Sequence, residues 1–259
     1  MLFAFDLDAT LVTDDFTLSN TTRDAVLALR EHGHIVTVIT GRPERAAKVF
    51  LEPLEVHTFY GTDHGARIVG EGNLLHRSEI TSTCLQDILV RARADGADVS
   101  FGVHDDVFVN NPDAPVWNWL RRFDHRMLPH SAYDASTHGS ADKLVMHNPA
   151  GHDSLLESLQ QDYPDLTYYN YETQLEITGK DGNKGAALAR LAEVFNVPQA
   201  QTVAFGDGLN DVSMIQWAGL SVSVGPRAHP QVRHAANEHV DAPEQEGVSR
   251  WLFEHILGR

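Results

Sequence analysis

The sequence predicts an α/β protein in which a doubly wound parallel sheet is interrupted by an inserted α+β domain. Residues 1–5, 34–40 and 202–205 are apolar runs without polar alternation, which is typical of strands buried on both faces of a parallel sheet. The first two runs are joined by an amphipathic segment of helical length, as in a βαβ unit. Residues 80–178 instead mix hairpin and helix patterns, which predicts a separate antiparallel α+β unit.

The first part of the predicted core alternates strands and helices. A helix is expected to begin near Ser19 or Asn20, both good N-caps, and to end at Gly33. The strand over residues 34–40 runs directly into Gly41-Arg42-Pro43, where Pro43 suits the first turn of another helix. A strand followed at once by a helix start is therefore predicted at this point.

The middle of the chain changes pattern, and it separates the two predicted domains. The core is expected to comprise residues 1–79 and 179–259, and the inserted domain residues 80–178. The elements expected before and within the insert are a strand at 56–60, a hairpin of 66–69 and 74–76, a helix from 85 to 96, strands at 99–104, 107–110 and 143–147, a helix at 154–161, and strands at 166–170 and 173–178.

The parallel pattern returns after the insert. A helix is expected to open at Lys184 and to end at Asn196. The strand at residues 202–205 then runs into Gly206-Asp207-Gly208-Leu209-Asn210-Asp211. A further strand at residues 220–224 and a closing helix near residues 248–257 complete the predicted core.

The composition limits which kinds of partner the protein can bind. A net charge of −16 argues against a nucleic acid or an anionic membrane surface as partner, because both are bound mainly through Lys and Arg. The single Cys cannot form an internal disulfide, so a cytoplasmic location is expected. No signal sequence or membrane-spanning stretch is expected either. The 15 His residues are scattered without a zinc-site spacing.

Acidic residues follow two of the predicted core strands. Asp6 and Asp8 come directly after residues 1–5, and Asp207 and Asp211 follow residues 202–205. If the two strands are neighbours, Asp6, Asp8 and Asp207 meet at one edge of the sheet, where three carboxylates are hard to tolerate without a divalent cation. Hard oxygen ligands favour Mg²⁺. For Asp6 and Asp8 the alternative is an Asp-rich turn whose side chains cap local backbone amides.

Thr40 and Lys184 extend this pattern. Thr40 stands where a strand end meets a helix start, a natural place for an anion, although a plain N-cap hydroxyl would also fit. Lys184 in the first turn of a helix opposes the helix dipole. The lysine either extends into water or reaches into the carboxylate cluster, where the acids and a phosphate would hold it.

Four motifs in this order resemble the haloacid dehalogenase (HAD) superfamily, and within it the Cof-like sugar-phosphatase branch. They are Asp6-Leu7-Asp8-Ala9-Thr10-Leu11, Thr40-Gly41-Arg42, Lys184-Gly185 and Gly206-Asp207-Gly208-Leu209-Asn210-Asp211. The resemblance implies a Rossmann-like core and an inserted cap domain that selects the substrate. Two departures stand out: Ala9 occupies a position where the branch usually has Gly, and His64 one where it usually has Asn.

The resemblance implies roles for the acidic residues. Asp6 would be the nucleophile that forms an aspartyl-phosphate, and Asp8 the general acid and base. Mg²⁺ would be held by Asp6, by the backbone carbonyl of Asp8 and by Asp207, while Asp211 would orient the waters of the metal.

Other residues would bind the phosphoryl group. Thr40, the Gly41 amide and Lys184 would contact its oxygens, Asn210 would fix the loop or touch the phosphate, and Arg42 would touch the substrate or pair with a surface acid. Arg121, Arg122 and Arg126 of the insert would meet a second anionic group, or form a solvated helix face.

The expected function is a Mg²⁺-dependent phosphatase that hydrolyses small phosphorylated metabolites, sugar phosphates in particular. A phosphomutase with the same core is the closest alternative. A signalling receiver is a more distant one, because receivers are about half this length and lack a cap. The protein is expected to be a monomer or a small homo-oligomer.

Overall fold

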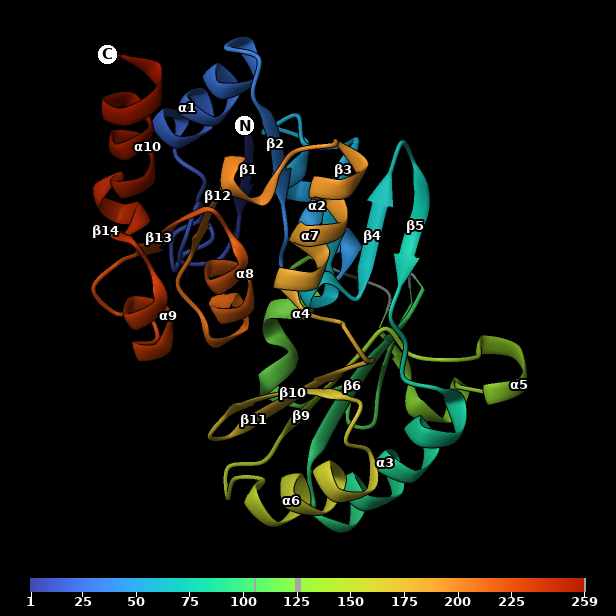
Figure 1. The fold of residues 1–259 in the computed structure, drawn as a ribbon. Coiled ribbons are helices and arrows are strands. Elements are labelled where there is room, and N and C mark those ends of the chain that lie inside the picture. The colour runs from blue at the N-terminus through green and yellow to red at the C-terminus, as the bar shows by residue number, and fades with distance from the viewer. Residues whose placement is uncertain (105, 124–126, 259) are drawn as a thin grey trace. The chain divides into compact units, whose positions relative to one another are not determined.

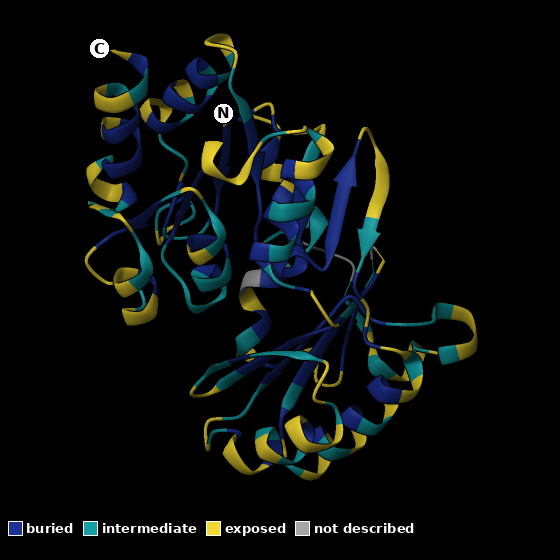
Figure 2. Cartoon of the chain, in the orientation of Figure 1, coloured by how far each residue is buried: buried dark blue, intermediate teal, exposed yellow. Residues whose placement is uncertain are grey.

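A computed structural model describes residues 1–104, 106–123 and 127–258, and the chain divides into two compact units (Figure 1). The first unit comprises Met1–Gly41, Ala47–Leu75 and Asn183–Arg259, and the second comprises Arg42–Ala46 and His76–Gly182. In each unit the strands are mostly buried, while the outward faces of the helices are exposed (Figure 2). Each unit therefore has its own core.

The first unit is built on a five-stranded parallel sheet with the order β14-β13-β12-β1-β2. Phe5 at the end of β1 lies opposite Phe205 of β12 on one side and Val38 of β2 on the other. The residues that follow β1 and β12 therefore emerge at the same edge of the sheet. The strands are β1 (Leu2–Phe5), β2 (Ile35–Val38), β12 (Thr202–Gly206), β13 (Leu220–Val224) and β14 (Glu238–Val240).

Helices cover both faces of this sheet, so the predicted doubly wound core is confirmed. On one face, the Trp251 ring of α10 packs edge-on against Phe205, with 5.2 Å between the ring centroids. On the other face, Leu188 and Leu191 of α7 pack against Leu2 and the neighbouring strand residues. The helices are α1 (Asn20–Glu31), α2 (Glu44–Leu51), α7 (Lys184–Val194), α8 (Val212–Trp217), α9 (Pro230–Ala235) and α10 (Gly247–Leu252).

A three-stranded sheet, β3 (Phe59–Thr62), β4 (Arg67–Gly70) and β5 (Asn73–Arg77), follows α2. The strand predicted at residues 56–60 is wrong in its bounds. The Val56 amide still donates to the Leu51 carbonyl, and Glu55 adopts a φ of 54°, so the chain is completing the end of α2 where the strand was expected. The strand begins at Phe59, where pairing with β4 starts.

The second unit has a six-stranded sheet with the order β10-β11-β9-β6-β7-β8. Its pairs are antiparallel except for β7 and β8, which agrees with the predicted α+β insert. The elements are α3 (Ser82–Ala94), β6 (Asp98–Val103), β7 (Asp106–Val109), α4 (Asn118–Phe123), β8 (Met127–Pro129), α5 (Ala135–His138), β9 (Lys143–His147), α6 (Asp153–Asp162), β10 (Thr167–Tyr171) and β11 (Gln174–Thr178).

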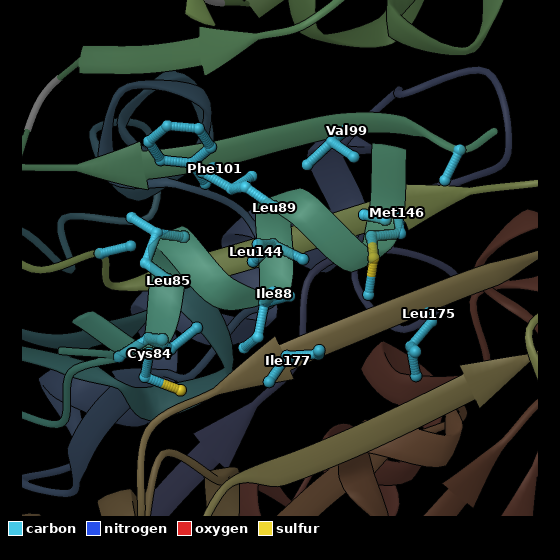
Figure 3. Close-up of a cluster of buried hydrophobic side chains, with 14 of the residues drawn as sticks. Cys84, Leu85, Ile88, Leu89, Val99, Phe101, Leu144, Met146, Leu175 and Ile177 are labelled. Carbon is cyan, nitrogen blue, oxygen red and sulfur yellow. The ribbon is translucent and has the colours of Figure 1, made fainter. Parts of the chain in front are cut away.

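The core of the second unit lies between its sheet and α3. Figure 3 shows Leu85, Ile88 and Leu89 of α3 among the side chains of β6, β9 and β11. The single cysteine, Cys84, belongs to the same cluster, and burial, aided by the charge of Asp87, raises the pKa of its thiol to about 11. Cys84 is therefore a packing residue of this core.

Two of the three arginines noted in the insert lie in the described part of α4. The Arg121 guanidinium donates to the side chain of Asn118 and to the carbonyl of Pro112, so it holds the segment that precedes the helix. The Arg122 guanidinium lies 5.8 Å from the ring centroid of Phe123. Arg126 falls outside the described residues.

Helix length and hydropathy bear on membrane insertion. Among residues 1–104, 106–123 and 127–258, every helix is too short or too polar to cross a bilayer.

Ala9 provides a test of backbone strain in the loop after β1, since it adopts a φ of 54°. A left-handed conformation destabilises the folded state by about 1–2 kcal/mol for an L-residue. Gly relieves this strain, but its greater conformational entropy in the unfolded chain lowers the stability by about 0.5–1 kcal/mol. We expect Ala9→Gly to raise the free energy of unfolding by about 0.5–1 kcal/mol in a denaturant titration. Ala189→Gly in the middle of α7 is the control and should lower it by about 1 kcal/mol. Equal losses in both variants would contradict the assignment of strain to Ala9.

Candidate active site

Three carboxylates meet at the edge of the sheet where β1 and β12 end. One oxygen from each of Asp6, Asp207 and Asp211 lies within 4.8 Å of the others. Asp6 is 5% exposed, and its amide donates to the Phe205 carbonyl at 3.1 Å, which continues the pairing of β1 with β12. The pairing of the two strands thus brings Asp6 together with acids that follow it by 201 and 205 positions in the chain.

Asp211 stabilises the loop that follows β12 through hydrogen bonds to its backbone. Its Oδ2 accepts hydrogen bonds from the amides of Asp207 at 2.9 Å and Gly208 at 2.8 Å. A β-carbon at Gly206 would lie 2.5 Å from the Asp211 carboxyl carbon, so only Gly fits there. Asp211 is fully buried, and its carboxylate fixes the backbone that carries Asp207.

Lys184 lies inside the cluster rather than in water. Its side chain is fully buried, with Nζ 2.7 Å from Asp6 Oδ1 and 2.6 Å from Asp211 Oδ1. It is the first residue of α7, whose N-cap Asn183 accepts a hydrogen bond from the Ala186 amide. Burial disfavours the charged amine, but the two carboxylates outweigh it and raise the pKa of Lys184 above its usual value.

The remaining negative charge exceeds what one lysine balances. Burial raises the pKa of Asp6 well above its usual range, and the charges of Asp211, Asp207 and Asp8 add to this, while Lys184 opposes it. Burial and the Asp211 charge raise the pKa of Asp207 to about 7, although Thr10 Oγ1 donates to Asp207 Oδ1 at 2.9 Å. The three carboxylates offer oxygen ligands that fit a divalent cation, whose charge would add to that of the one ammonium.

Asp8 follows Asp6 in the loop after β1 and is half-buried. The loop turns back at once, since the amides of Thr10, Leu11 and Val12 all donate to the Leu7 carbonyl. Asp8 does not supply an oxygen to the three-carboxylate group described above. Its predicted contribution through the backbone carbonyl stays a prediction.

The predicted phosphate-binding residues Thr40, Gly41 and Asn210 lie together in the first unit. Thr40 is fully buried, and its amide donates to the Gly61 carbonyl. A β-carbon at Gly41 would lie 3.2 Å from Asn210 Nδ2 and 2.6 Å from Cε1 of His64, so a side chain larger than Gly does not fit there. Close packing of these residues places the Gly41 backbone beside the Asn210 amide.

Arg42 belongs to the second compact unit, in the segment Arg42–Ala46. Its guanidinium lies 4.4 Å from the ring centroid of Phe123, and Nη1 donates to the Ala46 carbonyl at 3.4 Å. The side chain is 4% exposed. A cation over an aromatic ring is a favourable contact, so packing already accounts for part of its position. Its predicted role toward substrate stays a prediction.

Two residues of this region have contacts that the sequence patterns did not reveal. Thr10 donates to Asp207 across 197 positions of sequence, and His64 contacts both Gly41 and Asn210. The place of Thr10 near the acids could have been predicted, because it completes the Asp6-x-Asp8-x-Thr10 pattern directly after a strand. The partners of His64 are long-range and carry no local signal.

Lys184→Met tests the charge balance of this cluster. Removing the ammonium leaves the buried carboxylates of Asp6 and Asp211 unpaired, so the free energy of unfolding should fall by about 3–5 kcal/mol in a denaturant titration. Lys184→Met combined with Asp211→Asn should recover part of that loss. Lys180→Met is the control, because its exposed pair with Asp165 contributes under about 1 kcal/mol. A Lys184→Met variant as stable as wild type would show that the ammonium does not balance these acids.

The sequence and the fold were also compared with known proteins. A profile of the haloacid dehalogenase-like hydrolase family matches residues 3–252. The 5-amino-6-(5-phospho-D-ribitylamino)uracil phosphatase YitU of Bacillus subtilis is 27% identical, with 98% of this chain and 97% of the relative covered. A protein of Haemophilus influenzae named as a putative phosphatase is 28% identical, with 95% and 93% covered.

Solved structures show the same fold. A haloacid dehalogenase-like hydrolase from Bacteroides thetaiotaomicron superposes with a TM-score of 0.84 at 21% identity, with 98% of both chains covered. Family match and fold agree over nearly the whole chain, which confirms the resemblance stated from the sequence motifs and makes the protein an enzyme. The chain belongs to the haloacid dehalogenase-like hydrolases.

Proposed function

We propose that this enzyme is a Mg²⁺-dependent phosphatase that hydrolyses small phosphorylated metabolites, sugar phosphates in particular, through an aspartyl-phosphate on Asp6. The observation that carries the proposal is the buried cluster in which Lys184 pairs with Asp6 and Asp211 while Asp207 adds uncompensated charge. The two relatives described above are named as phosphatases, one of them putatively, which supports the same reaction class here.

Asp6, Asp207 and the Asp8 carbonyl would hold the metal. Asp211 is less suited to direct coordination, because Lys184 occupies one of its oxygens and two backbone amides occupy the other. It would instead orient the waters around the ion. When bound, Mg²⁺ would neutralise negative charge on the phosphoryl oxygens and the carboxylates.

The reaction would proceed in two displacements at phosphorus. A carboxylate oxygen of Asp6 attacks, the bond from phosphorus to the leaving oxygen breaks, and Asp8 gives its proton to that oxygen. Water then attacks the aspartyl-phosphate while Asp8 takes a proton from it, and this step releases inorganic phosphate and the Asp6 carboxylate. Asp8 would therefore serve once as acid and once as base.

Binding of the phosphoryl group would fall to Thr40, the Gly41 amide, Lys184 and Asn210, with Arg42 as a further candidate. Lys184 suits this role because its pKa stays above its usual value, which keeps the ammonium charged. Its position between Asp6 and Asp211 also fixes it in advance, so little reorganisation is needed during the transfer.

We propose that the inserted domain over residues 80–178 selects the substrate and that the core of residues 1–79 and 179–259 carries the chemistry. The substrate in the name of the Bacillus subtilis relative carries its phosphate on a ribityl chain, which supports a polyhydroxylated phosphate ester as substrate. A phosphate-release screen over sugar phosphates, nucleotides and cofactor phosphates, with and without Mg²⁺, tests this proposal. Release from none of them in the presence of Mg²⁺ would overturn it.

Asp6→Asn tests the nucleophile. The amide is a poor nucleophile, so steady-state phosphate release should fall by at least about 1,000-fold while the thermal unfolding midpoint stays near or above that of wild type. Asp14→Asn, an exposed acid that pairs with Arg227, is the matched control and should keep wild-type turnover. Turnover near wild type in Asp6→Asn would remove this residue from the nucleophile role.

Asp8→Asn tests the acid and base. An ester with a good leaving group needs no proton in the first step, so we expect a burst of released alcohol equal to the enzyme concentration, followed by slow turnover because water is no longer activated. Rapid-quench kinetics measures the burst. Fast turnover without a burst would assign the base to another residue.

Mg²⁺ should stabilise the protein in a pH-dependent way. Asp207 has its pKa raised from 3.8 to about 7, so between these pH values the ion-free folded state binds more protons than the unfolded state. The free energy of unfolding of the ion-free protein therefore falls as the pH rises from 3.8 to about 7. The cation needs the ionised carboxylate, so excess Mg²⁺ should raise the melting temperature more at about pH 8 than at about pH 6. An equal shift at both pH values, or an undiminished shift in Asp207→Asn, would contradict this.

A further inference from the structure

A strained turn packs against the predicted phosphate-binding residues Thr40 and Gly41. Asp63, His64 and Gly65 have consecutive φ values of 52°, 61° and 88°, and all three are buried. Two of them carry side chains, for which such a conformation costs about 1–3 kcal/mol each. A turn of this kind persists only where the surrounding contacts hold it, and such turns concentrate at functional sites.

The turn contacts three elements of the proposed site. The His64 amide donates to the Thr40 carbonyl at 2.9 Å, and the His64 ring lies against Gly41, where a β-carbon would come within 2.6 Å of Cε1. At Gly65, a β-carbon would lie 2.8 Å from the carbonyl oxygen of Asn183, the N-cap of α7. The turn of residues 63–65 thus connects the strand end at Thr40 with the start of α7, the helix that carries Lys184.

The His64 ring also orients Asn210. Nδ1 of His64 lies 2.9 Å from Nδ2 of Asn210. With the Asn210 amide in this orientation, Nδ2 donates, so a neutral His64 ring accepts at Nδ1 and carries its proton on Nε2. On the other side, a β-carbon at Gly208 would lie 2.6 Å from Asn210 Oδ1, which places the amide oxygen toward Gly208. The amide group of Asn210 therefore presents Nδ2 to His64 and Oδ1 to Gly208.

We infer that His64 is a positioning residue, which sets the Gly41 backbone and the Asn210 amide for binding of a phosphoryl group. This inference rests on the proposed function, since it names what the phosphate-binding residues depend on. It also gives a role to His64, one of the two departures noted from the sequence resemblance.

Three variants test the inference. His64→Gly removes the ring and the left-handed strain together, His64→Asn keeps a polar side chain that tolerates this conformation, and Glu71→Gly relieves an exposed left-handed residue in the turn between β4 and β5 as the control. The probe is inorganic phosphate with Mg²⁺, titrated calorimetrically, and steady-state kinetics on the best ester of the screen gives KM and kcat.

The expected result is specific to the ring. His64→Gly should melt no earlier than wild type yet bind phosphate about tenfold more weakly and raise KM to a similar extent. His64→Asn should recover most of the loss, and Glu71→Gly should bind phosphate as wild type does. Wild-type phosphate affinity in a folded His64→Gly variant would overturn the inference.

A second measurement does not depend on the variants folding. In the ¹⁵N spectrum of the wild-type protein, the His64 ring should show a proton on Nε2 and none on Nδ1. A proton on Nδ1 would mean that His64 donates to Asn210 instead, and it would overturn the assigned orientation. Failure of the proposed function would look different, because no ester would then release phosphate while the ring proton still lay on Nε2.

Discussion

The arrangement of this site depends on one buried ammonium group. Lys184 Nζ lies between Asp6 and Asp211, which belong to loops at the ends of two neighbouring strands. Its charge offsets part of the repulsion that burial would otherwise make prohibitive, since an unpaired buried carboxylate destabilises a fold by several kcal/mol. The unfavourable place of a cation in the first turn of α7 is thereby compensated. The same contact connects α7, β1 and β12.

Around this ion pair the loops are held by backbone geometry as much as by side chains. Asp211 accepts two amide hydrogen bonds, Gly206 leaves room for its carboxyl group, and Thr10 joins the loop after β1 to Asp207. Ala9 and His64, both with positive φ, border these loops. Part of the backbone strain of the molecule therefore lies where the sheet ends, as is usual where groups are positioned for binding or chemistry.

Much of the fold follows from local patterns. The strands β1, β2 and β12 are largely apolar because both of their faces are covered, whereas β13 alternates its apolar residues with Ser221 and Ser223. The helices that begin at Asn20 and Lys184 have recognisable N-caps, Ser19 and Asn183. The sequence patterns did not predict α9 and β14, because a six-residue helix and the three-residue strand Glu238-His239-Val240 are too short to show a period. The start of β3 was misplaced because the turn that follows α2 runs on to Val56, whose amide donates to the Leu51 carbonyl.

The candidate site could be predicted only in part. The acids at strand ends pointed to one edge of the sheet, but their meeting required that β1 and β12 be neighbours, which no local pattern establishes. The contact between His64 and Asn210 spans 146 positions and depends on the same assembly. Arg42 illustrates the converse, since its motif suggested a substrate contact while its guanidinium lies over the ring of Phe123.

A crystal structure of the enzyme grown with Mg²⁺ would show whether the carboxylate cluster holds a metal ion. We expect one ion held by Asp6, Asp207 and the Asp8 carbonyl, with Lys184 still paired to Asp6 and Asp211. An ion bound directly by Asp211 with Lys184 displaced, or a cluster that stays without an ion at saturating Mg²⁺, would contradict it.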